Sequence, residues 1–165
     1  MHTLVDGYNV LYAMPEFHSK SIQRDLETGR KLLAGKLMRY SRVTGGRITL
    51  VFDGRGRDLS EEAIGGTMRL AFTPDADEFI TETVRTSGAA GTVRVVTSDR
   101  ELREEVKRLG GSCQGPRSFL GEVKRAIRGS DEDTAEKPSD LGEEEVDGWL
   151  KEFGFREDEG KNDDG

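Results

Sequence analysis

The chain has 165 residues, of which 33% are hydrophobic and 35% are charged. This length suits one domain with its own core, but the low apolar content excludes a core that fills the whole chain. No apolar run approaches the roughly 20 residues of a membrane-spanning helix, and no signal-like segment opens the sequence, so we expect a cytoplasmic protein without a membrane partner. The single cysteine, Cys113, is expected to be a small buried strand residue rather than a reactive thiol.

Charge is distributed unevenly along the chain, whose formal net charge is −7. Residues 129–165 carry 15 acidic and 4 basic side chains, which leaves 17 acidic and 21 basic side chains in residues 1–128. A mildly basic body is compatible with a nucleic-acid partner, although this charge alone is weak evidence. We therefore expect a folded domain over 1–128 and an acidic, largely disordered tail over 129–165.

The first predicted element is a short buried strand at 2–5, which ends at Asp6-Gly7. Residues 8–23 are expected to be irregular, because Pro15 would interrupt a helix. A helix is expected at 25–43, where apolar side chains fall largely on one face and glycines follow the last turn.

A second strand is predicted at 47–52 and ends at Asp53-Gly54. After a loop rich in glycine and arginine, a weak strand is predicted at 67–72. Thr73-Pro74 then predicts a helix start, with the threonine hydroxyl as N-cap and proline at the first helical position. This helix is expected to end near Ser87.

Residues 92–97 form another predicted buried strand, and the sequence Ser98 to Glu101 has the pattern of a capping box that opens a helix. A short strand at 112–114 and a last helix at 118–127 complete the body. Because strands alternate with helices throughout, the sequence predicts an α/β fold with a parallel sheet covered on both faces.

Residues 141–153 contain an apolar stripe within the acidic tail. Val146, Trp149, Leu150 and Phe153 would lie on one side of a short helix. Two interpretations stay open: the helix docks on a protein partner, or it packs on its own domain.

Five aspartates fall at or just after the ends of predicted strands: Asp6, Asp53, Asp75, Asp77 and Asp99. The C-terminal ends of parallel strands share one edge of a sheet, so the fold would gather these carboxylates into one crevice. Carboxylates at close range repel one another and require a counter-charge, which Mg²⁺ or Mn²⁺ supplies. Such a cation lowers the pKa of bound water and stabilises charge on a phosphate, which is the chemistry of phosphodiester hydrolysis.

Each aspartate also has a purely structural explanation. Asp-Gly pairs form turns, and acids near helix N-termini interact favourably with the helix dipole. For any one aspartate the structural explanation is favoured, and only their joint placement on one edge reverses that preference. His2 and His18 have no metal-ligand spacing, and neither is assigned a role.

Polar, basic and aromatic side chains accompany this edge. Asn9 and Ser98 are candidates for supporting a carboxylate, a water or a phosphate, although Ser98 is also explained by helix capping. Phosphate-binding candidates are Arg55, Arg57, Arg69, Arg100, Arg103 and Arg117. Tyr8 and Tyr12 lie beside Asp6 and are candidates for stacking on RNA bases, against the alternative of ordinary packing.

Four motifs resemble those of one family. Residues 4–11 (LVDGYNVL) are similar to the opening motif of NYN domains, a branch of the PIN-like nucleases. Residues 51–54 (VFDG), 71–80 (AFTPDADEFI) and 95–100 (VVTSDR) follow in the same order. Within that group the chain resembles the YacP-like proteins over residues 1–128, whereas the tail matches nothing in the pattern.

The resemblance implies a PIN-like three-layer fold and an endoribonuclease that depends on Mg²⁺ or Mn²⁺. On the matching positions it implies that Asp6, Asp77 and Asp99 are catalytic and bind the metal. Asp53 and Asp75 would be secondary metal positions, and Asn9 would support Asp6. YacP-like proteins are further linked to cleavage of messenger RNA on the ribosome, so RNA and the ribosome are the implied partners.

Three classes of function are compared. The first is the endoribonuclease, and the second is an RNA- or ribosome-binding adaptor that keeps the fold without the chemistry. Retention of the acidic set favours the enzyme. A phosphatase or a phospho-receiver domain is disfavoured, because Tyr8 stands where a second aspartate would be needed and the last strand ends in Gln114-Gly115 without a lysine.

Overall fold

The computed structural model describes residues 1–15, 26–54, 60–64, 67–88 and 91–133. Within these ranges the chain forms one six-stranded sheet with the order β3-β4-β2-β1-β5-β6. The strands are β1 (His2–Asp6), β2 (Arg47–Asp53), β3 (Ser60–Ala63), β4 (Met68–Thr73), β5 (Val93–Val96) and β6 (Ser112–Gln114). All neighbours pair in parallel except β3, which is antiparallel to β4 at one edge. The predicted mostly parallel sheet is confirmed.

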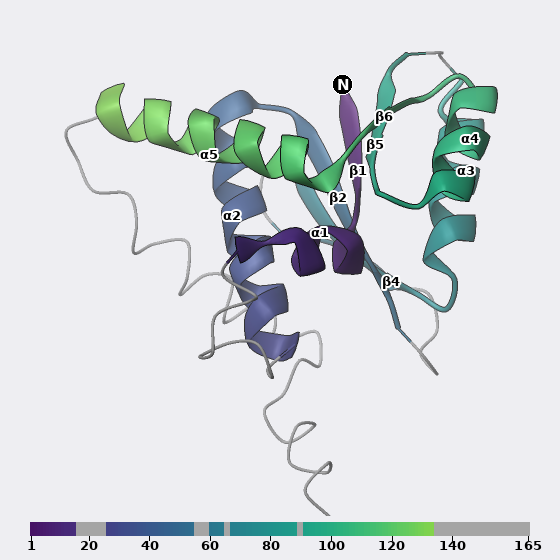
Figure 1. Ribbon diagram of the computed structural model, residues 1–165, viewed down its shortest axis with the longest axis horizontal. Coiled ribbons are helices and arrows are strands. Elements are labelled where there is room, and N and C mark those ends of the chain that lie inside the picture. Colours follow the sequence, from purple (N-terminus) through teal and green to yellow (C-terminus); the bar gives the residue numbers. More distant parts are fainter. Residues whose placement is uncertain (16–25, 55–59, 65–66, 89–90, 134–165) are drawn as a thin grey trace, which may run out of the picture.

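Helices cover both faces of this sheet, giving the expected three layers (Figure 1). One face carries α1, α2 and α5, and the other carries α3 and α4. Their bounds are α1 (Gly7–Ala13), α2 (Leu26–Thr44), α3 (Ala76–Thr86), α4 (Arg100–Arg108) and α5 (Pro116–Asp133). None of these helices is long and apolar enough to cross a membrane.

The central strands are buried on both sides, which explains why their sequences are continuously apolar. In β1, Val5 packs in the core beneath α1, α2 and α5, whereas Leu4 packs in the core beneath α3 and α4. In β2, Phe52 and Val51 divide between the two cores in the same way. Burying each such side chain contributes about 1.5–3 kcal/mol, so the strands that carry the aspartates are firmly held.

Helix α1 corrects the prediction that residues 8–23 are irregular. The helix starts directly after Asp6, which occupies the N-cap position with an extended backbone. It forms because Val10 and Leu11 are fully buried in the core, and it ends at Ala13 with Met14 as its C-cap, before Pro15 could interrupt it. The rest of that predicted segment, 16–25, lies outside the described residues.

Two helix starts also differ from the prediction. The N-cap of α3 is Asp75, because Thr73 is still the last residue of β4. The N-cap of α4 is Asp99 rather than Ser98. In both helices an aspartate carboxylate, rather than the predicted hydroxyl, caps the first turn.

The remaining differences concern β3 and α5. Strand β3 was not predicted, and its acidic sequence does not have the apolar pattern of a buried strand. Helix α5 is longer than the predicted 118–127 at both ends. Residues 129–133, predicted as the start of the disordered tail, belong to α5. The rest of the predicted tail, including its helix at 141–153, lies outside the described residues, so the domain division at 128 stays a prediction.

Candidate active site

The candidate site lies at the C-terminal edge of the sheet. Asp6 is the last residue of β1, the strand between β2 and β5, and Asp53 is the last residue of β2. Asp77 lies in the first turn of α3, just beyond the end of β4, and Asp99 precedes α4, three residues beyond the end of β5. The sheet thus brings residues from four separate segments to one edge, as the sequence predicted.

Asp6 lies at the centre of this group, and its carboxyl has a strongly raised pKa. Only 8% of the residue is exposed. Burial, the largest cause, raises its pKa from 3.8 to about 6. The hydrogen bond from Thr97 opposes this rise, whereas repulsion from Asp77, Asp99 and Asp53 adds to it. The four carboxylates are therefore close enough to interact electrostatically.

Asp77 is exposed but belongs to the same electrostatic group. Partial burial raises the pKa of its carboxyl, and repulsion from Asp99, Asp75 and Asp53 raises it further. Two carboxyls thus experience repulsion from overlapping sets of acids. A concentration of negative charge of this kind favours binding of a cation.

Asp75 and Asp99 also have the structural role that the sequence left open. Oδ1 of Asp75 accepts the backbone N–H of Glu78 at 3.1 Å. Oδ1 of Asp99 accepts the N–H groups of Glu101 at 3.0 Å and Leu102 at 3.3 Å. Capping through Oδ1 fixes both side chains at helix N-termini, and a carboxylate has a second oxygen that can bind a ligand.

Thr97, within the motif at 95–100, joins two of the acidic segments. It is completely buried, and its hydroxyl donates to Oδ2 of Asp6 at 2.9 Å and accepts the backbone N–H of Asp99 at 3.1 Å. Arg103 donates to the Thr97 carbonyl oxygen at 3.2 Å. The end of β1 is thereby tied to the start of α4.

Asn9 and Ser98 form a second connection across the same edge. Oδ1 of Asn9 accepts the backbone N–H of Ser98 at 2.9 Å and also the Ser98 hydroxyl. The contact joins α1 to the loop before α4, so it holds Asp6 and Asp99 in place from outside the acidic group. The structure thus gives both residues a bridging contact, in place of the helix cap predicted for Ser98.

The acidic group fits a divalent cation by donor type and by charge. Its donors are carboxylate and hydroxyl oxygens, which hard cations prefer, and its carboxylates repel one another without a counter-charge. Among the described residues, however, no three histidine, cysteine or acidic side chains already form a closed metal-binding cage. Binding would therefore require side-chain rotation, for which exposed Asp53 and Asp77 have room.

The predicted RNA-contact residues are only partly gathered at this edge. Arg100 begins α4 beside Asp99, and Arg117 lies at the exposed start of α5. Arg69, by contrast, is the second residue of β4, which runs on to Thr73, so it lies near the opposite end of the strand from the aspartates. Arg55 and Arg57 lie outside the described residues.

Tyr8 packs against other side chains, which is the alternative to the predicted stacking on RNA bases. Its ring lies 5.0 Å from that of Phe52 and 6.3 Å from that of Tyr12, and its hydroxyl accepts a hydrogen bond from Arg30 at 3.1 Å. Tyr12 is 52% exposed and is the more available aromatic surface. Cys113 is half-buried, and burial raises the pKa of its thiol, which disfavours a reactive thiolate.

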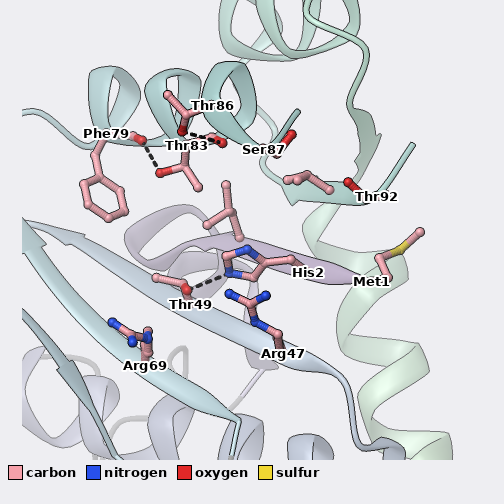
Figure 2. A pocket seen from close by; sticks show the side chains of 12 residues that line it. Met1, His2, Arg47, Thr49, Arg69, Phe79, Thr83, Thr86, Ser87 and Thr92 are labelled. Atoms are coloured by element: carbon pink, nitrogen blue, oxygen red, sulfur yellow. Dashed lines mark hydrogen bonds between the residues drawn. The ribbon is translucent and has the colours of Figure 1, made fainter. Parts of the chain in front are cut away.

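A second cleft, of about 540 Å³, lies at the opposite end of the strands and was not predicted (Figure 2). It is lined by His2, Arg47 and Arg69 from the sheet and by Thr83 and Thr86 from α3. Nε2 of His2 is 2.8 Å from Oγ1 of Thr49. This cleft could have been suspected from the sequence because polar side chains stand at the starts of otherwise apolar strands.

The chain matches the YacP-like NYN domain family over residues 3–153. It belongs to that family. The match extends beyond the predicted boundary at 128 and includes the apolar stripe of the tail. NYN domains are generally nucleases with an RNA-related role, and nucleases of this fold typically use divalent metals.

Individual relatives support the assignment to this NYN family. The uncharacterized protein YacP of Bacillus subtilis (strain 168) is 29% identical over 145 residues, covering 82% of this chain and 85% of that protein. The crystal structure of a tryptophan-to-leucine mutant of Rae1 (YacP) from Bacillus subtilis has a TM-score of 0.62 at 28% identity, covering 88% of this chain and 90% of that one. A second crystal structure of Rae1 (YacP) gives 0.63 at 26% identity, with coverage of 81% and 79%.

Proposed function

We propose that this NYN domain protein is a metal-dependent endoribonuclease. The observation that carries the proposal is the convergence of Asp77, Asp99 and Asp53 on the buried Asp6 at the C-terminal edge of a nuclease-like fold. Asp6, Asp77 and Asp99 would hold Mg²⁺ or Mn²⁺, and Asp53 and Asp75 would be secondary acidic positions. When bound, the ion activates water for attack on phosphorus and offsets the negative charge of the phosphate.

The chain's own residues position the reactants. Arg100 and Arg117 lie at the starts of α4 and α5, after β5 and β6, and would bind RNA phosphates next to the acidic group. Arg55 and Arg57 would extend the same surface, and exposed Tyr12, rather than packed Tyr8, would stack on a base. Thr97 would hold the Asp6 carboxylate in the orientation that binding requires.

The resemblance to YacP-like proteins extends the proposal to messenger RNA, with cleavage at the ribosome in the cytoplasm. Recognition of backbone phosphates by arginines is independent of sequence. Choice of message would then come from the ribosome rather than from base contacts in the protein. A defined message on which purified ribosomes are stalled should therefore be cut at a discrete position. The same RNA free in solution should be cut only weakly.

RNA cleavage in the absence of ribosomes is tested with the full chain, labelled RNA and Mn²⁺. Asp6→Asn, Asp77→Asn and Asp99→Asn should each reduce cleavage by at least a hundred-fold, since each removes a charged ligand. Glu104→Gln, which alters an exposed acid on the outer side of α4, is the matched control and should cut like the parent. Full activity in all three aspartate variants would exclude the proposed site.

A second candidate is an RNA- or ribosome-binding adaptor without catalysis. It is favoured by the capping roles of Asp75 and Asp99 and by the lack of a ready-made metal cage among the described residues. An adaptor should co-sediment with ribosomes while leaving every bound message intact in Mn²⁺. Its binding should also be unchanged by Asp6→Asn, because the acidic group would then have no ligand.

A further inference from the structure

A groove of about 860 Å³ runs along α5 and is bordered by α1 and α2, on the sheet face opposite α3 and α4. Its floor includes the half-buried side chains of Leu120 and Ile127 and the buried Val123. Five basic side chains also line it: Lys36, Arg39, Arg117, Lys124 and Arg128. None of the described side chains that line the groove is acidic. The groove is therefore apolar at its base and strongly positive at its rim.

Gly121 deepens this groove at its middle. A Cβ at this position would meet nothing within 4 Å except the end of the Arg125 side chain, at 3.4 Å. Glycine inside a helix costs about 0.5–1 kcal/mol relative to alanine. The absence of a side chain at Gly121 therefore leaves an open hollow on the groove surface between the basic residues of α5.

Residues 141–153 of the same chain have the complementary chemistry. Val146, Trp149, Leu150 and Phe153 are spaced as one face of a helix. The same segment carries five acidic residues and one lysine, against five basic residues at the groove. Such a helix would be about 20 Å long, and the stretch of α5 that lines the groove, 117–128, is about 18 Å long.

The connection between α5 and this segment is long enough for it to return. Helix α5 ends at Asp133, and seven residues separate it from Leu141. Extended, this connection spans up to about 26 Å. The far end of the groove, at Arg117, lies about 24 Å back along the helix from Asp133. The tether therefore reaches the whole groove and keeps the segment at a high local concentration beside it.

We propose that residues 141–153 dock as an amphipathic helix in the groove along α5 of the same chain. The apolar stripe covers Leu120 and Ile127, with a bulky side chain in the hollow at Gly121, and the acidic side faces the basic rim. Docking also covers Arg117, so the tail would compete with RNA there. That last consequence rests on the proposed nuclease function, whereas docking itself does not.

Trp149 is the chain's only tryptophan and reports directly on docking in the full-length protein. Its emission should be blue-shifted, and its quenching by acrylamide reduced, relative to the unfolded chain. The rim double variant Lys124→Glu/Arg128→Glu alters two exposed side chains and should shift the emission to longer wavelength and restore quenching. Gly121→Leu should have the same effect by filling the hollow, without changing charge.

The matched control is the double variant Arg85→Glu/Lys107→Glu, which makes the same charge change at exposed positions of α3 and α4. It should leave Trp149 emission unchanged. Quenching of Trp149 in the parent equal to that in the unfolded chain would overturn the proposal. Protection that disappears on dilution would assign the groove to the tail of a second copy. Loss of RNA binding in the rim variant with unchanged Trp149 emission would assign the groove to RNA instead.

Discussion

Thr97 and Asp6 form a buried hydrogen bond of 2.9 Å that joins the loop after β5 to the end of β1. The bond opposes the burial that raises the pKa of Asp6, because it stabilises the charged carboxylate. The same hydroxyl accepts the backbone N–H of Asp99 at 3.1 Å. Thr97 is thus a positioning residue for two of the proposed metal ligands.

Thr97→Val should raise the pKa of Asp6 above about 6, because it removes the hydrogen bond that stabilises the charged carboxylate. We expect weaker Mn²⁺ binding and a pH profile of RNA cleavage that moves to higher pH. Thr97→Ser keeps the hydroxyl and should behave like the parent in both respects. The direct measurement is the titration of the Asp6 carboxyl by NMR, and equal titration in parent and valine variant would contradict the role.

Stability without metal should depend on pH through Asp6. Its pKa in the fold, about 6, lies above its ordinary value of 3.8, so the folded state holds the proton more tightly. Stability should therefore fall as the pH rises from about 4 to about 6 and then level off. The difference is up to about 3 kcal/mol and comes mainly from burial of the carboxylate, with repulsion from Asp77, Asp99 and Asp53 adding to it. Chemical denaturation at several pH values in the presence of a chelator measures it.

Asp6→Asn separates this effect from the rest of the protein. The variant should lose most of the pH dependence and should be more stable than the parent at pH 7 without metal, because no buried charge remains. Mn²⁺ should raise the melting temperature of the parent but not that of the variant. A variant less stable than the parent at pH 7 would show that the Asp6 carboxylate stabilises the fold.

The position of the acidic edge could be predicted because each buried strand stops at a polar residue. Asp6 and Asp53 directly end apolar runs, so their place at the C-terminal edge follows from strand direction alone. The cap residues could not be assigned with the same certainty. Thr73 and Asp75, or Ser98 and Asp99, lie so close together that one residue of extra strand or loop exchanges their roles.

Contacts between segments that are far apart in the sequence were not predicted, for a different reason. Helix α1 forms because Val10 and Leu11 complete a core shared with α2 and α5, and local propensity does not contain that information. The groove along α5 likewise combines side chains of three helices that are far apart in sequence. Periodicity identifies which face of each helix is apolar, but not how much of that face its neighbours leave uncovered.

Gly7 was predicted as part of a turn, but the structure gives it a steric role. A Cβ at this position would lie 2.5 Å from two ring carbons of Phe52 and 2.7 Å from the carbonyl oxygen of Val51. Gly7→Ala should therefore destabilise the protein by about 1–3 kcal/mol or more and displace Asp6, its neighbour. Denaturant unfolding measures the first effect, and Mn²⁺ affinity measures the second.

Gly129→Ala is the matched control for this substitution. Gly129 lies in α5, and a Cβ there would meet nothing within 4 Å. The variant should be more stable than the parent by about 0.5–1 kcal/mol, because alanine is the better helix former. If Gly7→Ala were also stabilising, the close approach of α1 to Phe52 would be incorrect.

Arg94 connects the sheet to α5 on the face away from α3 and α4. It donates to Thr3 Oγ1 at 3.0 Å, to Gln114 Oε1 at 2.9 Å and to Glu122 Oε2 at 3.1 Å. Its guanidinium also lies 5.3 Å from the ring centre of Phe119. One side chain thus joins β1, β5, β6 and α5, and α5 in turn forms one side of the basic groove.

Arg94→Met should destabilise the protein by roughly 2–4 kcal/mol, because the partly buried Glu122 loses its cation while Thr3 and Gln114 lose donors. Glu122→Met alone should cost less, since Arg94 keeps Thr3 and Gln114 as partners. The double variant should lose less than the two single losses combined, because it leaves no unpaired charge. Denaturant unfolding of the four proteins measures this coupling, and strictly additive losses would mean that the ion pair does not hold α5 on the sheet.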